Sequence, residues 1–175
     1  MNLKNLIREI PDFPIPGISF KDISTLIKNA DAFHHIILTM ADYYRSFNPE
    51  LVVGIESRGY ILGAPIAYEL GCGFVLVRKP GKLPAETEKI EYALEYGTNA
   101  LEIHKDSINP GDKVLIVDDI LATGGTVAAT AELIQRLKGE ILGYAFLAEL
   151  DSLKGREKLR KLGDATIFSL VHYDE

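Results

Sequence analysis

One stretch of thirteen residues, Val114 to Thr126, constrains the fold more than any other part of the chain, and it reads V-L-I-V-D-D-I-L-A-T-G-G-T. Its first four residues are apolar and mostly β-branched, which predicts a strand buried on both faces of a parallel sheet. The carboxylates of Asp118 and Asp119 follow at once. Open α/β sheets bind ligands at the carboxyl ends of their strands, so we expect both carboxylates to face a ligand crevice.

The second half of this stretch turns the chain into a helix through Ala122, Thr123, Gly124, Gly125 and Thr126. Glycines allow positive φ and a close approach of the backbone to a ligand. The free N–H groups of the loop and the positive end of the helix dipole favour a phosphate. Phosphate binding beside two hydroxyl-binding carboxylates is the pattern expected for a ribose 5-phosphate. The simpler alternative is a strand, a glycine turn and two solvated carboxylates.

Other phosphate-binding motifs do not fit the stretch. No Gly-Lys-Ser/Thr follows the turn, which excludes a P-loop, and the G-x-G-x-x-G pattern of dinucleotide sites is missing. Composition narrows the class of protein further. The 175 residues are 47% hydrophobic and 25% charged, which predicts one globular domain over residues 1–175.

Charge and cysteine content argue against several partners and compartments. The net charge of −6 argues against a general nucleic-acid or membrane surface, and no apolar run has the length of a membrane span. Cys72 is the single cysteine, which fits a reducing cytoplasm and leaves no intrachain disulfide. The four histidines show no metal-ligand spacing, so we interpret them as structural or surface residues.

Hydrophobic periodicity predicts alternating strands and helices. The expected strands are 51–55, 73–77, 114–117, 141–150 and 165–171, and the expected helices are 2–10, 31–47 with Asp31 as N-cap, 60–70, 127–138 stopped by Gly139, and 153–162. Residues 86–104 alternate with a period of two, which predicts a β-hairpin outside the parallel core and an active-site lid over residues 80–108. This order predicts an α/β fold with a doubly wound, mostly parallel sheet.

The N-terminal segment and two loops stand apart from this pattern. Three prolines in residues 11–17 fix a stiff, extended path, and residues 18–23 are expected to form an edge strand or a packed arm. The loop at Glu56-Ser57-Arg58-Gly59 follows a core strand, so Arg58 either binds an anion or lies on the surface. The cations Arg78, Lys79 and Lys82 bracket a Pro-Gly turn, which is either a solvated loop or a polyanion site.

Six segments together resemble the adenine phosphoribosyltransferase family within the type I phosphoribosyltransferases. They are P-D-F-P-I-P-G-I-S-F-K-D-I (11–23), G-I-E-S-R-G-Y (54–60), V-R-K-P-G-K-L-P (77–84), L-E-Y-G (94–97), V-D-D-I-L-A-T-G-G-T (117–126) and S-L-K-G-R-E-K-L (152–159). The resemblance implies the type I phosphoribosyltransferase fold with an N-terminal hood over residues 1–30. It also implies a cytoplasmic homodimer that converts adenine and phosphoribosyl pyrophosphate (PRPP) into AMP and pyrophosphate with Mg²⁺.

The resemblance further implies a role for each site residue. Asp118 and Asp119 would bind the ribose, and Ala122 to Thr126 the 5-phosphate. Pyrophosphate would contact Glu56, Ser57, Arg58, Gly59, Arg78, Lys79 and Lys82. Adenine would be read by the backbone of Ser19 and Lys21 and packed between Phe20 and Ile120. Glu95 and Arg58 would be catalytic, with Tyr96 in the same lid, and the protein would supply no direct Mg²⁺ ligand.

Several features leave alternatives open. Glu56 stands where some members have Asp, and Ser19 occupies a position that is apolar in some relatives. Glu95 could instead be an exposed hairpin carboxylate. Transfer to hypoxanthine, guanine or xanthine needs different partners for a 6-oxo group. A non-catalytic PRPP sensor would carry a helix-turn-helix domain and a basic face, which this acidic chain does not show.

Overall fold

The computed structural model of the chain describes residues 1–94 and 97–174. Its helices and strands are η1 Lys4–Leu6, β1 Arg8–Ile10, β2 Phe20–Asp22, α1 Ser24–Ile27, α2 Ala30–Arg45, β3 Leu51–Ile55, α3 Arg58–Leu70, β4 Gly73–Arg78, β5 Thr87–Ala93, β6 Thr98–His104, β7 Lys113–Leu121, α4 Gly125–Arg136, β8 Glu140–Leu150, η2 Asp151–Leu153, α5 Gly155–Arg160 and β9 Thr166–Tyr173. In the described residues, no helix is long and apolar enough to cross a membrane.

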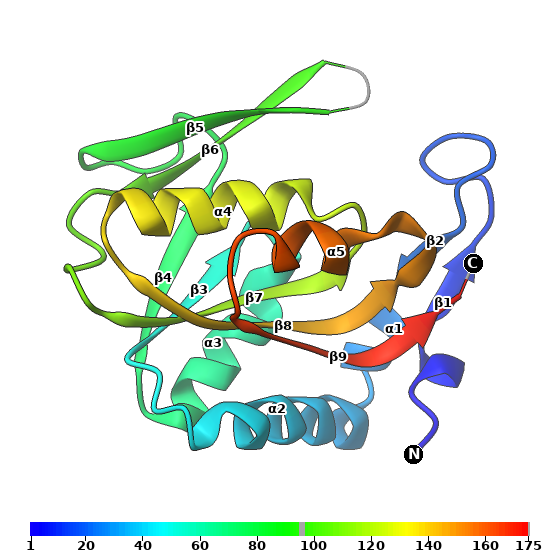
Figure 1. Ribbon diagram of the computed structural model, residues 1–175. Coiled ribbons are helices and arrows are strands. Elements are labelled where there is room, and N and C mark those ends of the chain that lie inside the picture. Colours follow the sequence, from blue (N-terminus) through cyan, green and yellow to red (C-terminus); the bar gives the residue numbers. More distant parts are fainter. Residues whose placement is uncertain (95–96, 175) are drawn as a thin grey trace.

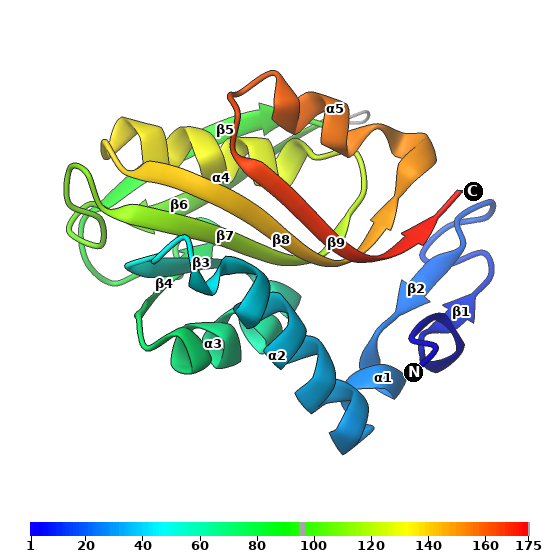
Figure 2. The same ribbon diagram turned by 60° about the horizontal axis from the view of Figure 1, so that its bottom comes forward.

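A seven-stranded sheet in the order β5-β6-β4-β3-β7-β8-β9 forms the centre of the molecule (Figure 1). Within this sheet, the five neighbouring strands β4, β3, β7, β8 and β9 pair in parallel, and only the hairpin strands β5 and β6 are antiparallel. Helices α2 and α3 cover one face, and α4 and α5 cover the other (Figure 2). The predicted doubly wound, mostly parallel α/β fold is therefore confirmed.

The apolar run of β7 explains why this strand lies at the centre. Val114 and Ile116 pack into the core on the α4 side of the sheet, whereas Leu115 and Val117 pack into the core on the α2–α3 side. Each of these four side chains is fully buried. Because both faces are covered, every position of the run must be apolar, as a central parallel strand requires.

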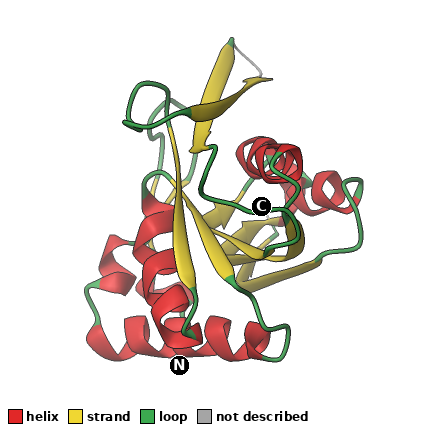
Figure 3. Cartoon of the chain, turned by 90° about the vertical axis from the view of Figure 1, so that its left-hand side faces the viewer, coloured by secondary structure: helices red, strands yellow, loops and turns green. Residues whose placement is uncertain are grey.

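The hairpin extends the central sheet instead of standing outside it. Val77 and Arg78 at the end of β4 pair with Ile103 and Glu102 of β6. The alternating pattern correctly predicted a hairpin outside the five parallel strands, and the buried side chain of Ile103 joins this hairpin to the core on the α4 side of the sheet. The hairpin projects beyond the body of the protein at the sheet edge (Figure 3).

The expected helix over residues 2–10 was also wrong. Only a single 3-10 turn forms, and Arg8–Ile10 pairs antiparallel with Phe20–Asp22 in a separate two-stranded sheet. Leu3 and Ile7 are spaced as on one face of a helix, and both side chains are indeed buried, but only the 3-10 turn lies between them. The cross-strand ion pair between Arg8 and Asp22 favours the ladder over the helix.

Two helix ends differ from the sequence prediction. Asn29, and not Asp31, caps α2, and its side chain accepts a hydrogen bond from the N–H of Ala32 at 3.0 Å. After α4, the left-handed residue is Lys138 with φ of 63°, and not Gly139. Gly139 is required for packing instead, because a Cβ there would lie 2.8 Å from Ile134 Cγ2.

Candidate active site

The carboxyl ends of β3 and β7 open into a cavity of about 250 Å³. Its wall consists of two loop-to-helix junctions and the end of β7. The lining residues are Glu56, Ser57, Arg58, Asp118, Asp119, Ile120, Ala122, Thr123, Gly124, Gly125, Thr126 and Val127. All of these except Val127 and Ile120 were predicted from the sequence as phosphate, ribose or pyrophosphate residues, and Ile120 was predicted to contact the base.

Two helix N-termini meet at this cavity. The 13-residue helix α3 begins at Arg58, and the 12-residue helix α4 begins at Gly125, after Gly124 with φ of 82°. Each N-terminus presents unsatisfied N–H groups and the positive end of a helix dipole. The cavity can therefore bind two separate anionic groups, one at each helix.

Gly59 allows α3 to approach the end of β7. A Cβ at this position would lie 2.9 Å from the carbonyl oxygen of Val117 and 3.1 Å from Asp118 Oδ1. Only glycine avoids that contact, so the G-x-x-x-R-G sequence brings the Glu56–Arg58 loop beside the two aspartates. The Glu56–Ser57 peptide bond in this loop is cis.

The two aspartates differ in environment. Burial, followed by the charge of Asp119, raises the pKa of Asp118 well above its ordinary value of 3.8, although Asp118 Oδ1 accepts a hydrogen bond from the Asp119 N–H at 2.9 Å. Asp119 is buried, and its Oδ2 lies 2.8 Å from Arg58 Nε without the alignment of a hydrogen bond. Asp119 Oδ2 is thus a buried acceptor with spare capacity for a hydroxyl donor.

Arg58 connects the cavity to the N-terminal segment. Its guanidinium group lies 5.1 Å from the ring centre of Phe20 in β2, and Phe20 contacts Phe13 edge to face at 5.2 Å. The 43% exposure of the Arg58 side chain leaves it free to change partners. Arg58 therefore lies between Asp119 and the Pro-rich segment.

The basic loop after β4 is attached to Glu56. Arg78 approaches Glu56 Oε1 at 3.4 Å, and the N–H of Lys79 donates to Glu56 Oε2 at 2.8 Å. Burial opposes ionisation of Glu56, but these contacts together lower its pKa below the usual value. Arg78 and Lys79 therefore lie next to the cavity without lining it, and Lys82 is exposed farther along the loop.

The remaining predicted residues are placed outside the cavity or beyond the described residues. The Lys21 side chain is buried, lying 3.1 Å from Glu9 and 4.4 Å from the ring centre of Tyr173, so only its backbone remains available to a ligand. Ser19 is exposed, and its hydroxyl accepts a hydrogen bond from Lys21 at 3.3 Å. The predicted catalytic Glu95 and lid residue Tyr96 lie outside the described residues.

Sequence reasoning missed two contacts to the glycine-rich loop of residues 122–126. The hydroxyl of Tyr92, in the hairpin, lies 3.2 Å from Thr126 Oγ1. Gly155, at the start of α5, packs directly on the loop backbone. The segment S-L-K-G-R-E-K-L was part of the family resemblance, but no physical feature of that segment assigned it a role.

Comparisons with known proteins agree with this geometry. Residues 23–171 match the family model described as the phosphoribosyl transferase domain, which defines the class of protein. Among curated relatives, the adenine phosphoribosyltransferase of Halothermothrix orenii is 59% identical, with 91% of this chain and 94% of the relative covered. That of Synechococcus sp. is 54% identical over 99% of this chain and 100% of the relative.

Solved structures give the same result. The adenine phosphoribosyltransferase of Thermoanaerobacter pseudethanolicus superposes with a TM-score of 0.92 at 52% identity, with 97% of both chains covered. The Saccharomyces cerevisiae enzyme, complexed with an imino-altritol bisphosphate and adenine, gives a TM-score of 0.87 at 42% identity, with 95% of both chains covered. The chain belongs to the adenine phosphoribosyltransferase family.

Proposed function

We propose that the protein transfers the 5-phosphoribosyl group of PRPP to adenine and releases AMP and pyrophosphate, a reaction of purine salvage. The observation that carries this proposal is one cavity that is lined both by two helix N-termini and by Asp118 and Asp119. PRPP has the matching layout, with a phosphate at one end, two hydroxyls in the middle and a pyrophosphate at the other end.

The N-terminus of α4 suits the 5-phosphate. Gly124 and Gly125 let the backbone approach the phosphate oxygens, and Thr123 and Thr126 add hydroxyl donors on the same wall. Next to them, Asp118 and Asp119 would accept hydrogen bonds from the ribose hydroxyls. The spare acceptor Asp119 Oδ2 supports this assignment.

The N-terminus of α3 suits the pyrophosphate. Cleavage of the bond between ribose C1 and pyrophosphate leaves negative charge on the leaving group and oxocarbenium character on the sugar. Arg58 and the N–H groups at the start of α3 would stabilise the departing charge, assisted by Arg78, Lys79 and Lys82. Gly59 and Ser57 shape the loop, and Glu56 holds the Lys79 backbone and the Arg78 side chain beside it.

The carboxylate-rich wall also fits Mg²⁺, because this ion prefers oxygen ligands. Asp118, Asp119 and Glu56 would face an ion that PRPP carries on its own oxygens, with water molecules completing the shell. When bound, Mg²⁺ supplies positive charge that favours pyrophosphate as a leaving group.

The N-terminal hood, residues 1–30, is proposed to cover the base. Phe20 and Ile120 would pack on the two faces of adenine, and backbone groups of Ser19 and Lys21 would read its edge. Adenine must lose a ring proton when its other ring nitrogen attacks C1, and Glu95 is proposed to accept that proton. Replacement of Glu95 by Gln is therefore expected to lower turnover more than PRPP affinity.

Arg58 is proposed to change partners when PRPP binds. In the structure its Nε lies 2.8 Å from Asp119 Oδ2, and its guanidinium group lies over the ring of Phe20. A ribose hydroxyl would replace it on Asp119, and the guanidinium group would then bind the pyrophosphate. We propose the hairpin of residues 80–108, including Tyr96, as the lid over this arrangement.

A homodimer is proposed from an apolar stripe on α3. Ile61, Ala64 and Tyr68 lie at helical spacing and are exposed, and Tyr68 is 85% exposed. Leu76 of β4 adds an exposed apolar side chain on the same side of the sheet, since Phe74 two residues earlier packs under α3. Light scattering after gel filtration should give twice the chain mass, and Tyr68→Arg should give a monomer.

A cytoplasmic location is proposed because Cys72 is the single cysteine. We expect no nucleic-acid or membrane partner at the net charge of −6.

The catalytic proposal is tested with a panel of bases. Purified protein, PRPP and Mg²⁺ are mixed with adenine, hypoxanthine, guanine or xanthine, and nucleotides are separated by chromatography. The proposal predicts AMP from adenine and little product from the three 6-oxopurines. Product from a 6-oxopurine alone would overturn the base assignment. PRPP binding without product from any base would indicate a sensor.

A further inference from the structure

The segment from Asp151 to Arg156 packs against the proposed phosphate loop through backbone atoms. A Cβ on Gly155 would lie 2.3 Å from the carbonyl oxygen of Ala122 and 2.8 Å from Leu121 Cδ1. Reciprocally, a Cβ on Gly124 would lie 3.1 Å from the carbonyl oxygen of Gly155. No flexible side chain separates the two backbones, so a displacement of the segment must displace the loop.

An arginine–carboxylate pair holds the C-terminal end of this segment. Arg156 donates to both oxygens of Glu149, from Nε at 2.9 Å and from Nη2 at 2.6 Å, and its Nη1 donates to the carbonyl of Ile167 at 3.0 Å. The Ser169 hydroxyl donates to Glu149 Oε2 at 2.7 Å. The Glu149 side chain is only 4% exposed, so this bidentate pair is rigid and shielded from solvent.

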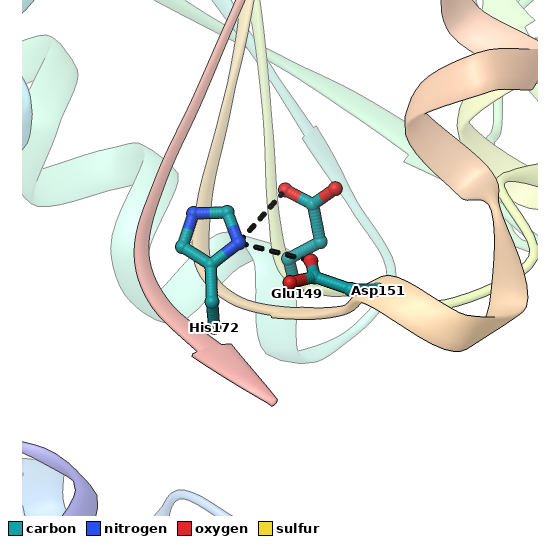
Figure 4. A group of neighbouring side chains, drawn as sticks. All are labelled: Glu149, Asp151 and His172. Atoms are coloured by element: carbon teal, nitrogen blue, oxygen red, sulfur yellow. Dashed lines mark hydrogen bonds and ion pairs between the residues drawn. The ribbon is translucent and has the colours of Figure 1, made fainter. Parts of the chain in front are cut away.

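A second pair holds the N-terminal end. His172 of β9 lies with Nδ1 2.9 Å from Asp151 Oδ1 and 3.9 Å from Glu149 Oε2 (Figure 4). These three side chains could by distance surround a cation. Arg156 already contacts both Glu149 oxygens, and Ser169 donates to one of them, so we assign the group to the attachment of the segment and not to a metal.

We propose that Gly155, Arg156 and Glu149 are positioning residues for the 5-phosphate loop, which they hold in place from outside the cavity. The proposal rests on the proposed function, because it assigns the loop to the 5-phosphate of PRPP. Loop N–H groups bind a phosphate only when they converge on it, and direct contact with Gly155 fixes the position of the Ala122–Gly124 backbone. The Glu149–Arg156 pair fixes the position of Gly155, because it attaches Arg156 to strands β8 and β9.

The test measures ribose 5-phosphate binding by calorimetry in Arg156→Ala, Arg156→Lys and Glu149→Gln. Arg160→Ala is the matched control, because Arg160 is an exposed arginine on the same helix. We expect the ribose 5-phosphate Kd and the KM for PRPP to rise about tenfold in Arg156→Ala and Glu149→Gln. The change in kcat should be smaller than the change in KM. Arg156→Lys keeps the charge without the two-pronged contact, so it should restore part of the affinity.

A purely structural role would give a different result. Thermal stability would fall in Arg156→Ala while the ribose 5-phosphate Kd and the PRPP KM of the folded fraction stayed at wild-type values, and this would overturn the proposal. An equal loss in Arg160→Ala would also overturn it. If Arg156→Ala does not fold, Ser169→Ala removes one hydrogen bond to Glu149 and is judged by the same ratio of Kd values.

Failure of the proposed function can be recognised separately. It is judged by AMP formation in the wild-type protein, whereas the positioning role is judged by the ratio of variant to wild-type Kd. A wild-type protein that binds ribose 5-phosphate without forming AMP would contradict the function and leave this ratio measurable.

Discussion

Replacement of Asp118 by Asn should make the ligand-free protein more stable and the enzyme less active. Asp118 keeps an acceptor in either form, because an Asn oxygen can still accept the Asp119 N–H, which now donates at 2.9 Å. What the substitution removes is a carboxylate whose charged form is opposed first by burial and then by Asp119.

The sign of the stability effect follows from the raised pKa of Asp118. Above the ordinary value of 3.8 the unfolded chain loses this proton while the folded protein retains it, so the contribution of Asp118 to stability falls as pH rises. Each unit of elevation costs the folded state about 1.4 kcal/mol at higher pH. Asp118→Asn should therefore raise the free energy of unfolding and Tm, and the gain should grow as pH rises above 3.8.

The activity should change in the opposite direction. Loss of one hydrogen bond from a ribose hydroxyl costs about 0.5–1.5 kcal/mol, so kcat/KM for PRPP should fall by about two- to tenfold. Thermal denaturation and initial rates measure the two effects on the same preparation. Asp119→Asn should be less stabilising, because Asp119 has Arg58 at 2.8 Å, and exposed Asp106→Asn is the neutral control. A lower Tm in Asp118→Asn would refute the reasoning.

Three further substitutions test the packing of the fold and of the site. Tyr44→Phe should lose about 1–3 kcal/mol of stability in denaturant titrations, because the buried hydroxyl lies 2.7 Å from the carbonyl of Tyr144 and 3.0 Å from that of Thr166; an unchanged midpoint would contradict this. Gly59→Ala should lower kcat/KM by roughly tenfold or more, since its Cβ would lie 2.9 Å from the Val117 carbonyl and push α3 away from β7; wild-type rates would show that the helix adapts. Glu149→Gln should reduce the fall of Tm at acid pH. Burial opposes the charge of Glu149, but Arg156 and Ser169 lower its pKa below the usual 4.5. The stabilisation by this carboxylate is therefore present above pH 4.5 and is lost as pH falls through the folded pKa. Equal slopes in the two proteins would mean that this carboxylate does not contribute.

The central strand and the cavity could be predicted because their physical requirements are local. An apolar run covered on both faces, two carboxylates at its end and a glycine turn leave few alternatives, and Val114 to Thr126 contains all three. The polar loop after β3 follows the same rule, since parallel strands end at one edge of the sheet. The Arg58–Asp119 contact joins these two loops.

What the sequence did not reveal depends on contacts between distant segments. Leu3 and Ile7 are buried at helical spacing, yet a strand forms there because Phe20–Asp22 is available as a partner. Ile103 alternates like a half-exposed strand residue, but it is fully buried in the core on the α4 side of the sheet. In the sequence Gly155 resembles an ordinary helix start, and only the structure shows that it packs against the Ala122 carbonyl. Such contacts pair residues far apart in sequence, so local patterns do not specify them.

The most direct test of the proposed site is a crystal structure with AMP bound. The proposal predicts the phosphate on the N–H groups of residues 123–126, the ribose hydroxyls on Asp118 and Asp119, and the base between Phe20 and Ile120. A phosphate bound instead at Arg78 and Lys79, with the two aspartates free of ribose, would contradict the proposed orientation of the substrate.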